Sequence, residues 1–374
     1  MTEKVLLKDI LFNKGKVEKI AGEIQRVHPS FKKNEFVRDV VAKFPELELK
    51  ARISWIAECL KKYLPSDYKR AVGILIKALP EPNNPELSDD DFGDFIYAPY
   101  AEYVAKNGCT KENLSYSLNA FREMTTRFSS EDAIRYFLNA FPQETLKELL
   151  KWSKDEHYHV RRLCSEGTRP KLPWSQKINI LITAPLPILD NLFSDKTRFV
   201  TRSVANHIND ISKIDPDLAI GTLSRWKKSG KQTPKEMDYI IRHALRTLIK
   251  DGNPKALKLL GVSHEADVRV SNFKVPKEVK MNTTLYFSFS FEANEEAHIV
   301  ADYVLYFQNK LGKLNGRKVF KLKKFSLAKG ESITLTKRHM LREHMTTRKL
   351  FRGKHEIEIQ INGKSFGKKA FMVV

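Results

Sequence analysis

The apolar residues of this chain change their spacing once, and that change divides the sequence into two parts of different fold class. Over residues 1–262 they recur at helical intervals, interrupted by segments such as "LPSD", "RFSSED" and "KIDPD" that are typical of helix ends. Beyond "LGVSHEADVRV" they alternate with polar residues, as in "TLYFSFSFEA" and "SITLTKR", which is the period of a strand. We therefore predict an all-helical domain over residues 1–262 and an all-β domain over residues 265–374.

The helical part contains an internal repeat of forty residues. When the sequence is aligned with itself at that shift, Arg162 falls on Arg202 and on Arg242, and Val160 falls on Val200. This period is typical of HEAT-like helix pairs, each of which buries its apolar face only against the next pair. We predict an α-solenoid whose helices are irregular at the N-terminal end, where the period is weak.

The β part predicts six or seven strands in its 110 residues, which suits an immunoglobulin-like sandwich better than a closed barrel. It holds no Cys or Trp, so the expected likeness is one of architecture. Residues 265–374 contain 22 Lys and Arg against 11 Asp and Glu, and thus carry +11 of the chain's net charge of +21. A passive spacer has no need of such a charge.

Of the bulk properties of this chain, the net charge of +21 says most about its binding partner. Lys and Arg in such excess attract polyanions by counterion release, so nucleic acid is the first candidate. Anionic lipid is the alternative, but no amphipathic segment has a basic face opposite a Trp- and Phe-rich one. The first ten residues, "MTEKVLLKDI", lack the apolar run of a secretory signal. We expect a cytoplasmic protein, at the nucleoid while it acts, that does not bind membranes.

Sequence motifs for cofactors and metals are missing. The three cysteines lie about fifty residues apart without C-x-x-C spacing, which predicts neither a disulfide framework nor a zinc site. Glycine-rich phosphate loops, H-E-x-x-H and calcium-binding loops do not occur. His157 and His159 lie one residue apart near a helix start and therefore face different ways. We expect neither a metal nor a cofactor.

The helix predicted in "FVTRSVANHINDISK" carries an apolar stripe from Val200 to Ile211 and a polar stripe on its other side. The repeat places similar polar residues on the helices before and after it. These polar residues are Arg162, Glu166, Arg169, Arg202, Asn206, Asp210 and Arg242. Arg162 and Glu166 are also an i,i+4 pair, which on an exposed helix contributes only about 0.3 to 0.5 kcal/mol and implies no function.

Two further residues have both a structural and a functional interpretation. Trp174 follows a proline, and such a ring is commonly a core or capping aromatic. Glu131 is expected in the first turn of a helix capped by Ser129 or Ser130, where the helix dipole favours an acid. The pattern alone leaves these interpretations open.

The stretches "WSKDEHYHVRRLCSEGTRPKLPW", "RFVTRSVANHINDISKIDPDLAIGTLSRW" and "SSEDAIRYFL" resemble the AlkC branch of the AlkC/AlkD DNA alkylation-repair glycosylases, a HEAT-like family. The similarity covers about residues 130–226, and it is specific because a generic helical repeat has no reason to spell S-E-G-x-R-P-x-L-P-W. Family members usually have Phe, Pro and Ala where this chain has Asp132, Tyr136 and Cys164. Some carry a C-terminal immunoglobulin-like domain, which agrees with the strand pattern.

The resemblance implies a base excision repair enzyme that acts on double-stranded DNA containing alkylated bases. Bases such as 3-methyladenine, and as a second candidate 3-methylcytosine, are cationic and leave as neutral molecules, so they need no general acid. Carboxylates would stabilise the oxocarbenium-like sugar and orient the water. The implied catalytic group is Glu131, Glu166 and Asp210, working without metal and without full base flipping.

The resemblance also implies how DNA is bound. Trp174 would pack against the lesion nucleotide, while Arg162, Arg169 and Arg202 would hold the backbone. Asn206 and Arg242 belong to the same polar stripe and are expected on the DNA side. The β domain, with "GKLNGRKVFKLKK" as its most basic run, is expected to clamp the duplex as an accessory domain of a monomeric enzyme.

Two other classes of function compete with this prediction. A non-catalytic HEAT-repeat scaffold would use its charge only to anchor a partner to DNA or RNA. A phosphodiester nuclease would require a metal-binding cluster of carboxylates, which the sequence does not supply. Replacing Glu166 by Gln separates the first class from an enzyme, because only an enzyme would lose base release while still binding DNA.

Overall fold

The computed structural model describes residues 6–84, 93–262, 267–345 and 348–374. The chain forms two compact units, one of Met1–Ile211 with Trp226–Ala244 and the other of Ser212–Arg225 with Leu245–Val374. In the described part of the chain, no helix has both the length and the apolar character needed to cross a membrane.

The first unit is helical, as predicted. Helices α8, α9, α10 and α11 contact one another in sequence order, and α10 and α12 begin forty residues apart, at Tyr158 and Arg198. The elements of this unit are α1 (Leu7–Leu11), α2 (Lys14–Val27), α3 (Lys33–Ala42), η1 (Phe44–Glu46), α4 (Leu49–Tyr63), α5 (Tyr68–Ala78), η2 (Phe95–Tyr97), α6 (Ala98–Gly108), α7 (Leu114–Thr125), α8 (Ile134–Ala140), α9 (Pro142–Trp152), α10 (Tyr158–Glu166), α11 (Leu186–Leu192), α12 (Arg198–Ser212) and α14 (Pro234–Ala244).

Helices α10 and α12 are both buried along most of their length. The apolar stripe predicted on α12 is confirmed, because Val200, Val204, Ile208 and Ile211 are completely buried. Burial of each such side chain contributes about 1.5–3 kcal/mol to stability. Helix α10 is buried along nearly its whole length, including Glu166. Its buried polar groups must therefore find partners inside the protein.

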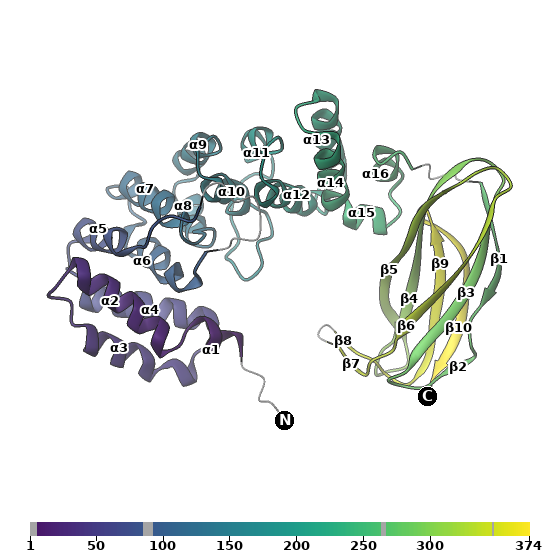
Figure 1. The fold of residues 1–374 in the computed structure, drawn as a ribbon, viewed down its shortest axis with the longest axis horizontal. Helices are drawn as coiled ribbons and strands as arrows, with labels where there is room; N and C mark the ends of the chain where they lie inside the picture. The colour runs from purple at the N-terminus through teal and green to yellow at the C-terminus, as the bar shows by residue number, and fades with distance from the viewer. Residues whose placement is uncertain (1–5, 85–92, 263–266, 346–347) are drawn as a thin grey trace. The chain divides into compact units, whose positions relative to one another are not determined.

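The second unit contains a β-sandwich, which confirms the predicted all-β class (Figure 1). One sheet has the order β1-β3-β6 and the other β2-β10-β9-β4-β5, and phenylalanines of β3 such as Phe289 and Phe291 fill the core between them. The strands are β1 (Val268–Lys274), β2 (Glu278–Val279), β3 (Thr284–Ala293), β4 (Ala297–Gln308), β5 (Leu314–Leu327), β6 (Ser332–Met340), β7 (His344–Met345), β8 (Arg348–Lys349), β9 (Gly353–Ile361) and β10 (Lys364–Val373).

Helices α13 (Pro216–Ser229), α15 (Arg246–Lys250) and α16 (Pro254–Leu259) complete the elements. Although α15 and α16 fall within the predicted helical domain, they pack with the β-sandwich. Leu257 of α16 lies in a small buried cluster with Val300 of β4, and a Cβ on Gly252 would meet the Gly363 backbone at 2.6 Å. The predicted first residue of the β domain, at 265, lies outside the described residues.

Candidate active site

A cavity of about 220 Å³ lies among α4, α6, α10, α12 and the segment before α8. Its walls are largely apolar, with Ile53, Phe128 and Phe199 among the lining residues. Three predicted site residues line it, from three separate segments of the chain. They are Glu131, Arg162 and Trp174.

Glu131 lies on the cavity wall in the turn before α8. Its Oε2 accepts hydrogen bonds from Ser129 Oγ at 2.8 Å and from Arg162 Nη1 at 2.6 Å. Within the described part of the chain, its Oε1 has no hydrogen-bond partner. The side chain is 27 % exposed. One carboxylate oxygen is thus fixed and the other is available to the cavity.

The serine cap predicted for this helix is wrong. Helix α8 begins only at Ile134 and has no side-chain cap. The Ser129 hydroxyl donates to the Glu131 carboxylate, which is a charge-assisted hydrogen bond. Ser130 is buried and its backbone nitrogen donates to Thr125. Glu131 therefore lies outside the helix, in a segment that both serines help to fix.

Arg162 on α10 lies between two carboxylates. Besides Glu131, it reaches Glu166 Oε2 at 3.9 Å, and its guanidinium lies 4.5 Å above the Phe199 ring. Burial lowers the pKa of Arg162, but Glu131 and Glu166 outweigh that effect and raise it above its usual value. Arg162 is therefore a permanent cation, and Glu131 and Glu166 largely compensate its charge.

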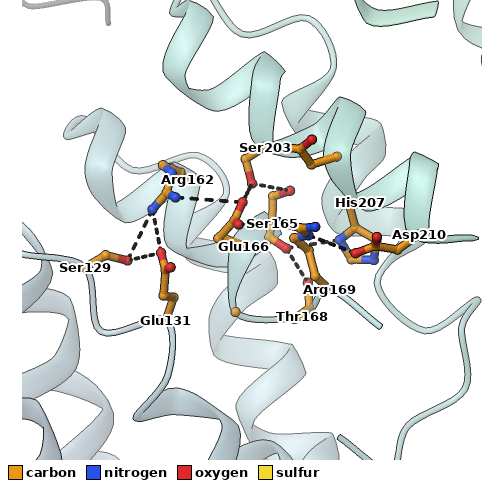
Figure 2. A network of polar contacts seen from close by, with 12 residues as sticks. Ser129, Glu131, Arg162, Ser165, Glu166, Thr168, Arg169, Ser203, His207 and Asp210 are labelled. Carbon is orange, nitrogen blue, oxygen red and sulfur yellow. Dashed lines mark hydrogen bonds and ion pairs between the residues drawn. The ribbon is translucent and has the colours of Figure 1, made fainter. Parts of the chain in front are cut away.

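Glu166 and Asp210 extend this network into the interior (Figure 2). Arg169 donates to Glu166 Oε1 at 2.5 Å and to Asp210 Oδ2 at 2.9 Å, while Ser203 donates to Glu166 Oε2 at 2.6 Å. Burial would raise the pKa of Glu166, yet Arg162, Arg169 and Ser203 together lower it. The residues Glu166 and Asp210 are only 5 % and 2 % exposed. Neither lines the cavity.

Trp174 is not a core aromatic, because 83 % of it is exposed. The loop that carries Trp174 is anchored by Arg135, a fully buried side chain of α8. Arg135 donates to the carbonyl oxygens of Gly167 and Arg169 at 2.9 Å each and of Gln176 at 2.6 Å. The loop between α10 and α11 is thereby held on both sides of the exposed ring.

The remaining predicted residues lie away from the cavity. Arg202 and Asn206 are partly buried on α12, and the His243 ring nitrogen lies 2.8 Å from Asn206 Oδ1. Arg242 pairs with Asp238 at 3.2 Å, with half of its side chain exposed. These residues do not line the cavity, so any contact they make with DNA lies elsewhere on the surface.

Sequence reasoning missed the opposite wall of the cavity, which α4 and α6 supply. Lys50 of α4 and Ala98 of α6 lie far from the repeat in the chain, and no motif marks them. Phe199 could have been predicted as a lining residue, since it directly precedes the apolar stripe of α12. Among the described residues, no group of three or more His, Cys, Asp or Glu is arranged to hold a metal ion.

Comparison with known proteins places this chain beside proteins of known sequence and structure. Residues 269–374 match a family model described as "Uncharacterised protein YhaZ, C-terminal Ig-like domain". The chain is 32 % identical over 363 residues to the uncharacterized protein YhaZ of Bacillus subtilis (strain 168), covering 96 % of each. The solved structure of Pseudomonas fluorescens alkylpurine DNA glycosylase AlkC, bound to DNA containing an abasic site analog, is similar with a TM-score of 0.89 and 33 % identity, over 99 % of this chain and 100 % of that one.

Proposed function

Because the chain belongs to the family of YhaZ and AlkC, we propose that it is a DNA glycosylase that removes alkylated bases from double-stranded DNA. The observation that carries the proposal is Glu131, whose carboxylate lies on the wall of an apolar cavity with one oxygen held by Arg162 and Ser129. The likeness to AlkC over the whole chain supports the same function.

The reaction is hydrolysis of the N-glycosidic bond of a cationic base, with 3-methyladenine as the first substrate and 3-methylcytosine as the second. Such a base departs as a neutral molecule, so the barrier lies in the positive charge that develops on the deoxyribose. Glu131 stabilises this charge, and its Oε1 orients the attacking water. No proton donor to the leaving base is required, and we propose that no metal takes part.

Glu166 and Asp210 act in this proposal through other residues. Glu166 Oε2 lies 3.9 Å from Arg162 Nη2, and Arg169 donates to both Glu166 and Asp210. In this proposal the attraction of Glu166 shares the charge of Arg162 between two carboxylates, so Glu131 is only partly neutralised. The buried network fixes the geometry and charge of the one carboxylate that faces the cavity.

Trp174 contacts the lesion nucleotide at the edge of the cavity, and the base is not fully flipped. The exposure of the ring supports this role, since 83 % of the residue faces solvent in the free protein. Of the two proposed domains, residues 1–262 carry the chemistry. Residues 265–374, with a net charge of +11, hold the duplex as an accessory domain of a monomer.

The test is release of free base from methylated duplex DNA in the presence of a chelator. We expect release by the wild type and a loss of about 100- to 1000-fold in Glu131→Gln, with DNA binding retained. Glu102→Gln is the matched control, because Glu102 lines the same cavity but is bound by Ser54 and Lys106. Absence of release by the wild type, despite salt-sensitive DNA binding, would show a non-catalytic binding protein.

A further inference from the structure

The backbone of Trp174 adopts a conformation that a bulky residue rarely takes. Ser175 N donates to Leu172 O at 3.3 Å, which closes a β-turn with Pro173 and Trp174 at its two central positions. The proline requires a negative φ, and Trp174 has a φ of 62°. This is the geometry of a type II turn, whose second central position favours Gly. The exposed ring gains too little burial to offset this strain, so other contacts must hold the turn.

Lys50 supplies such a contact from a distant part of the chain. Its Nζ donates to the carbonyl oxygen of Trp174 at 2.7 Å and to Asp132 Oδ2 at 2.6 Å. Asp132 directly follows Glu131, so one ammonium group links the turn that bears the tryptophan to the segment that bears the carboxylate. Lys50, Asp132 and Trp174 all line the same cavity as Glu131.

Asp132 also neutralises the positive charge that Lys50 brings into the cavity. An uncompensated ammonium in this cavity would repel both a cationic base and the positive charge that develops on the sugar. The Asp132 carboxylate, paired with Lys50 at 2.6 Å, cancels that charge. The lysine thus fixes the turn without opposing the chemistry of Glu131.

We propose that Lys50 and Asp132 are a positioning pair. They hold the Trp174 ring at a fixed position relative to the Glu131 carboxylate, so that both groups meet the lesion nucleotide. The inference rests on the proposed function but goes beyond it, because neither residue touches a reacting atom. Both side chains are partly exposed, at 50 % and 37 %. The pair therefore contributes little to global stability, and its loss acts on the turn rather than on the fold.

The experiment compares Lys50→Met, Asp132→Asn and Lys50→Arg in the full-length protein. Acrylamide quenching of tryptophan fluorescence reports the environment of Trp174, and Trp174→Phe identifies its component among the four tryptophans. Single-turnover base release and the affinity for undamaged duplex are measured on the same samples. Lys62→Met is the matched control, since Lys62 lies on the same helix and pairs with Asp39 at 2.7 Å, away from the cavity.

We expect Lys50→Met to shift the Trp174 quenching and to slow base release about tenfold to a hundredfold, with unchanged affinity for undamaged DNA. Asp132→Asn should slow release more, because it leaves the ammonium unpaired. Lys50→Arg should recover most of the rate, since a guanidinium can serve both acceptors. The control should match the wild type.

Wild-type quenching and wild-type release in Lys50→Met would overturn the inference. A shift in quenching without a change in rate would also overturn it, because the turn would then not matter for catalysis. If the wild type itself releases no base, the proposed function fails. The quenching comparison still decides, in that case, whether Lys50 fixes the Trp174 turn.

Discussion

At the scale of single residues, the three acids of the predicted catalytic group have different environments. Glu131 is partly exposed on the cavity wall and contacts Arg162 and Ser129. Glu166 is buried beside two arginines, and Asp210 holds one of them. Removing the charge of each acid should therefore have different consequences for stability, even where the consequence for catalysis is the same.

Glu166→Gln should destabilise the protein by about 3–5 kcal/mol, because it leaves buried guanidinium charge uncompensated. Glu131→Gln should cost only about 1 kcal/mol, since its partner Arg162 keeps Glu166. Urea unfolding measures both values, and both variants should lose base release. Retention of full activity by a folded Glu166→Gln would show that the buried network is not needed to orient Glu131.

His207 should make the helical unit sensitive to acid. It is fully buried, its Nδ1 lies 3.0 Å from Ser165 O, and burial lowers its pKa to about 3 despite that contact. The folded pKa lies below the unfolded value near 6.5, so the stability due to the neutral ring is complete above pH 6.5. It is lost as the pH falls toward 3.

Between pH 7 and pH 4.5 this loss amounts to about 2–3 kcal/mol. His207→Asn keeps a donor near the Ser165 carbonyl and has no group that titrates in this range, so its stability should fall less over the same interval. Urea unfolding of both proteins at the two pH values checks the prediction. An equal fall in both would assign the acid sensitivity to other groups.

At the scale of structural elements, the turn that bears Trp174 trades stability for function. A non-glycine residue in a left-handed conformation costs about 1–2 kcal/mol, and the exposed ring offsets little of that cost. Trp174→Gly should therefore raise the free energy of unfolding by about 1 kcal/mol while lowering base release. A destabilised Trp174→Gly, measured by urea unfolding, would contradict the strain proposed for this turn.

The elements also show which local signals are reliable. The stripe of α12 from Val200 to Ile211 was predictable because its period is a property of adjacent residues, and burial confirms it. The start of α8 was not, because residues 131–133 form a turn and the helix begins only at Ile134, beyond the reach of either serine as a cap.

At the scale of the whole molecule, the net charge of +21 should make DNA binding strongly dependent on salt. Lys318, Lys321 and Lys323 on β5 are exposed and, among the described residues, form no ion pair. On β10, by contrast, Lys368 lies 3.4 Å from Glu356. The three lysines of β5 are therefore candidates for binding phosphates.

Replacing Lys318, Lys321 and Lys323 together by Gln should reduce the slope of log K against log salt by up to about 3, near one unit for each phosphate that is no longer neutralised. The matched control instead replaces three lysines of β10, a strand separated from β5 by β9 and β4 in the same sheet. They are Lys364, Lys368 and Lys369. Equal slopes in the two triple variants would indicate a general effect of charge rather than specific binding of phosphates by β5.

The sequence by itself determined the class of each part of the chain. Helical and strand periods are properties of adjacent residues, so they can be recognised without tertiary information. A specific motif around Glu166 and Trp174 pointed to the family. Only the tertiary structure decided which acid reaches the cavity. The exposure of each acid depends on which elements cover it in the folded protein. Lys50 and Trp174 are 124 residues apart in the sequence, so their contact forms only when the helices pack.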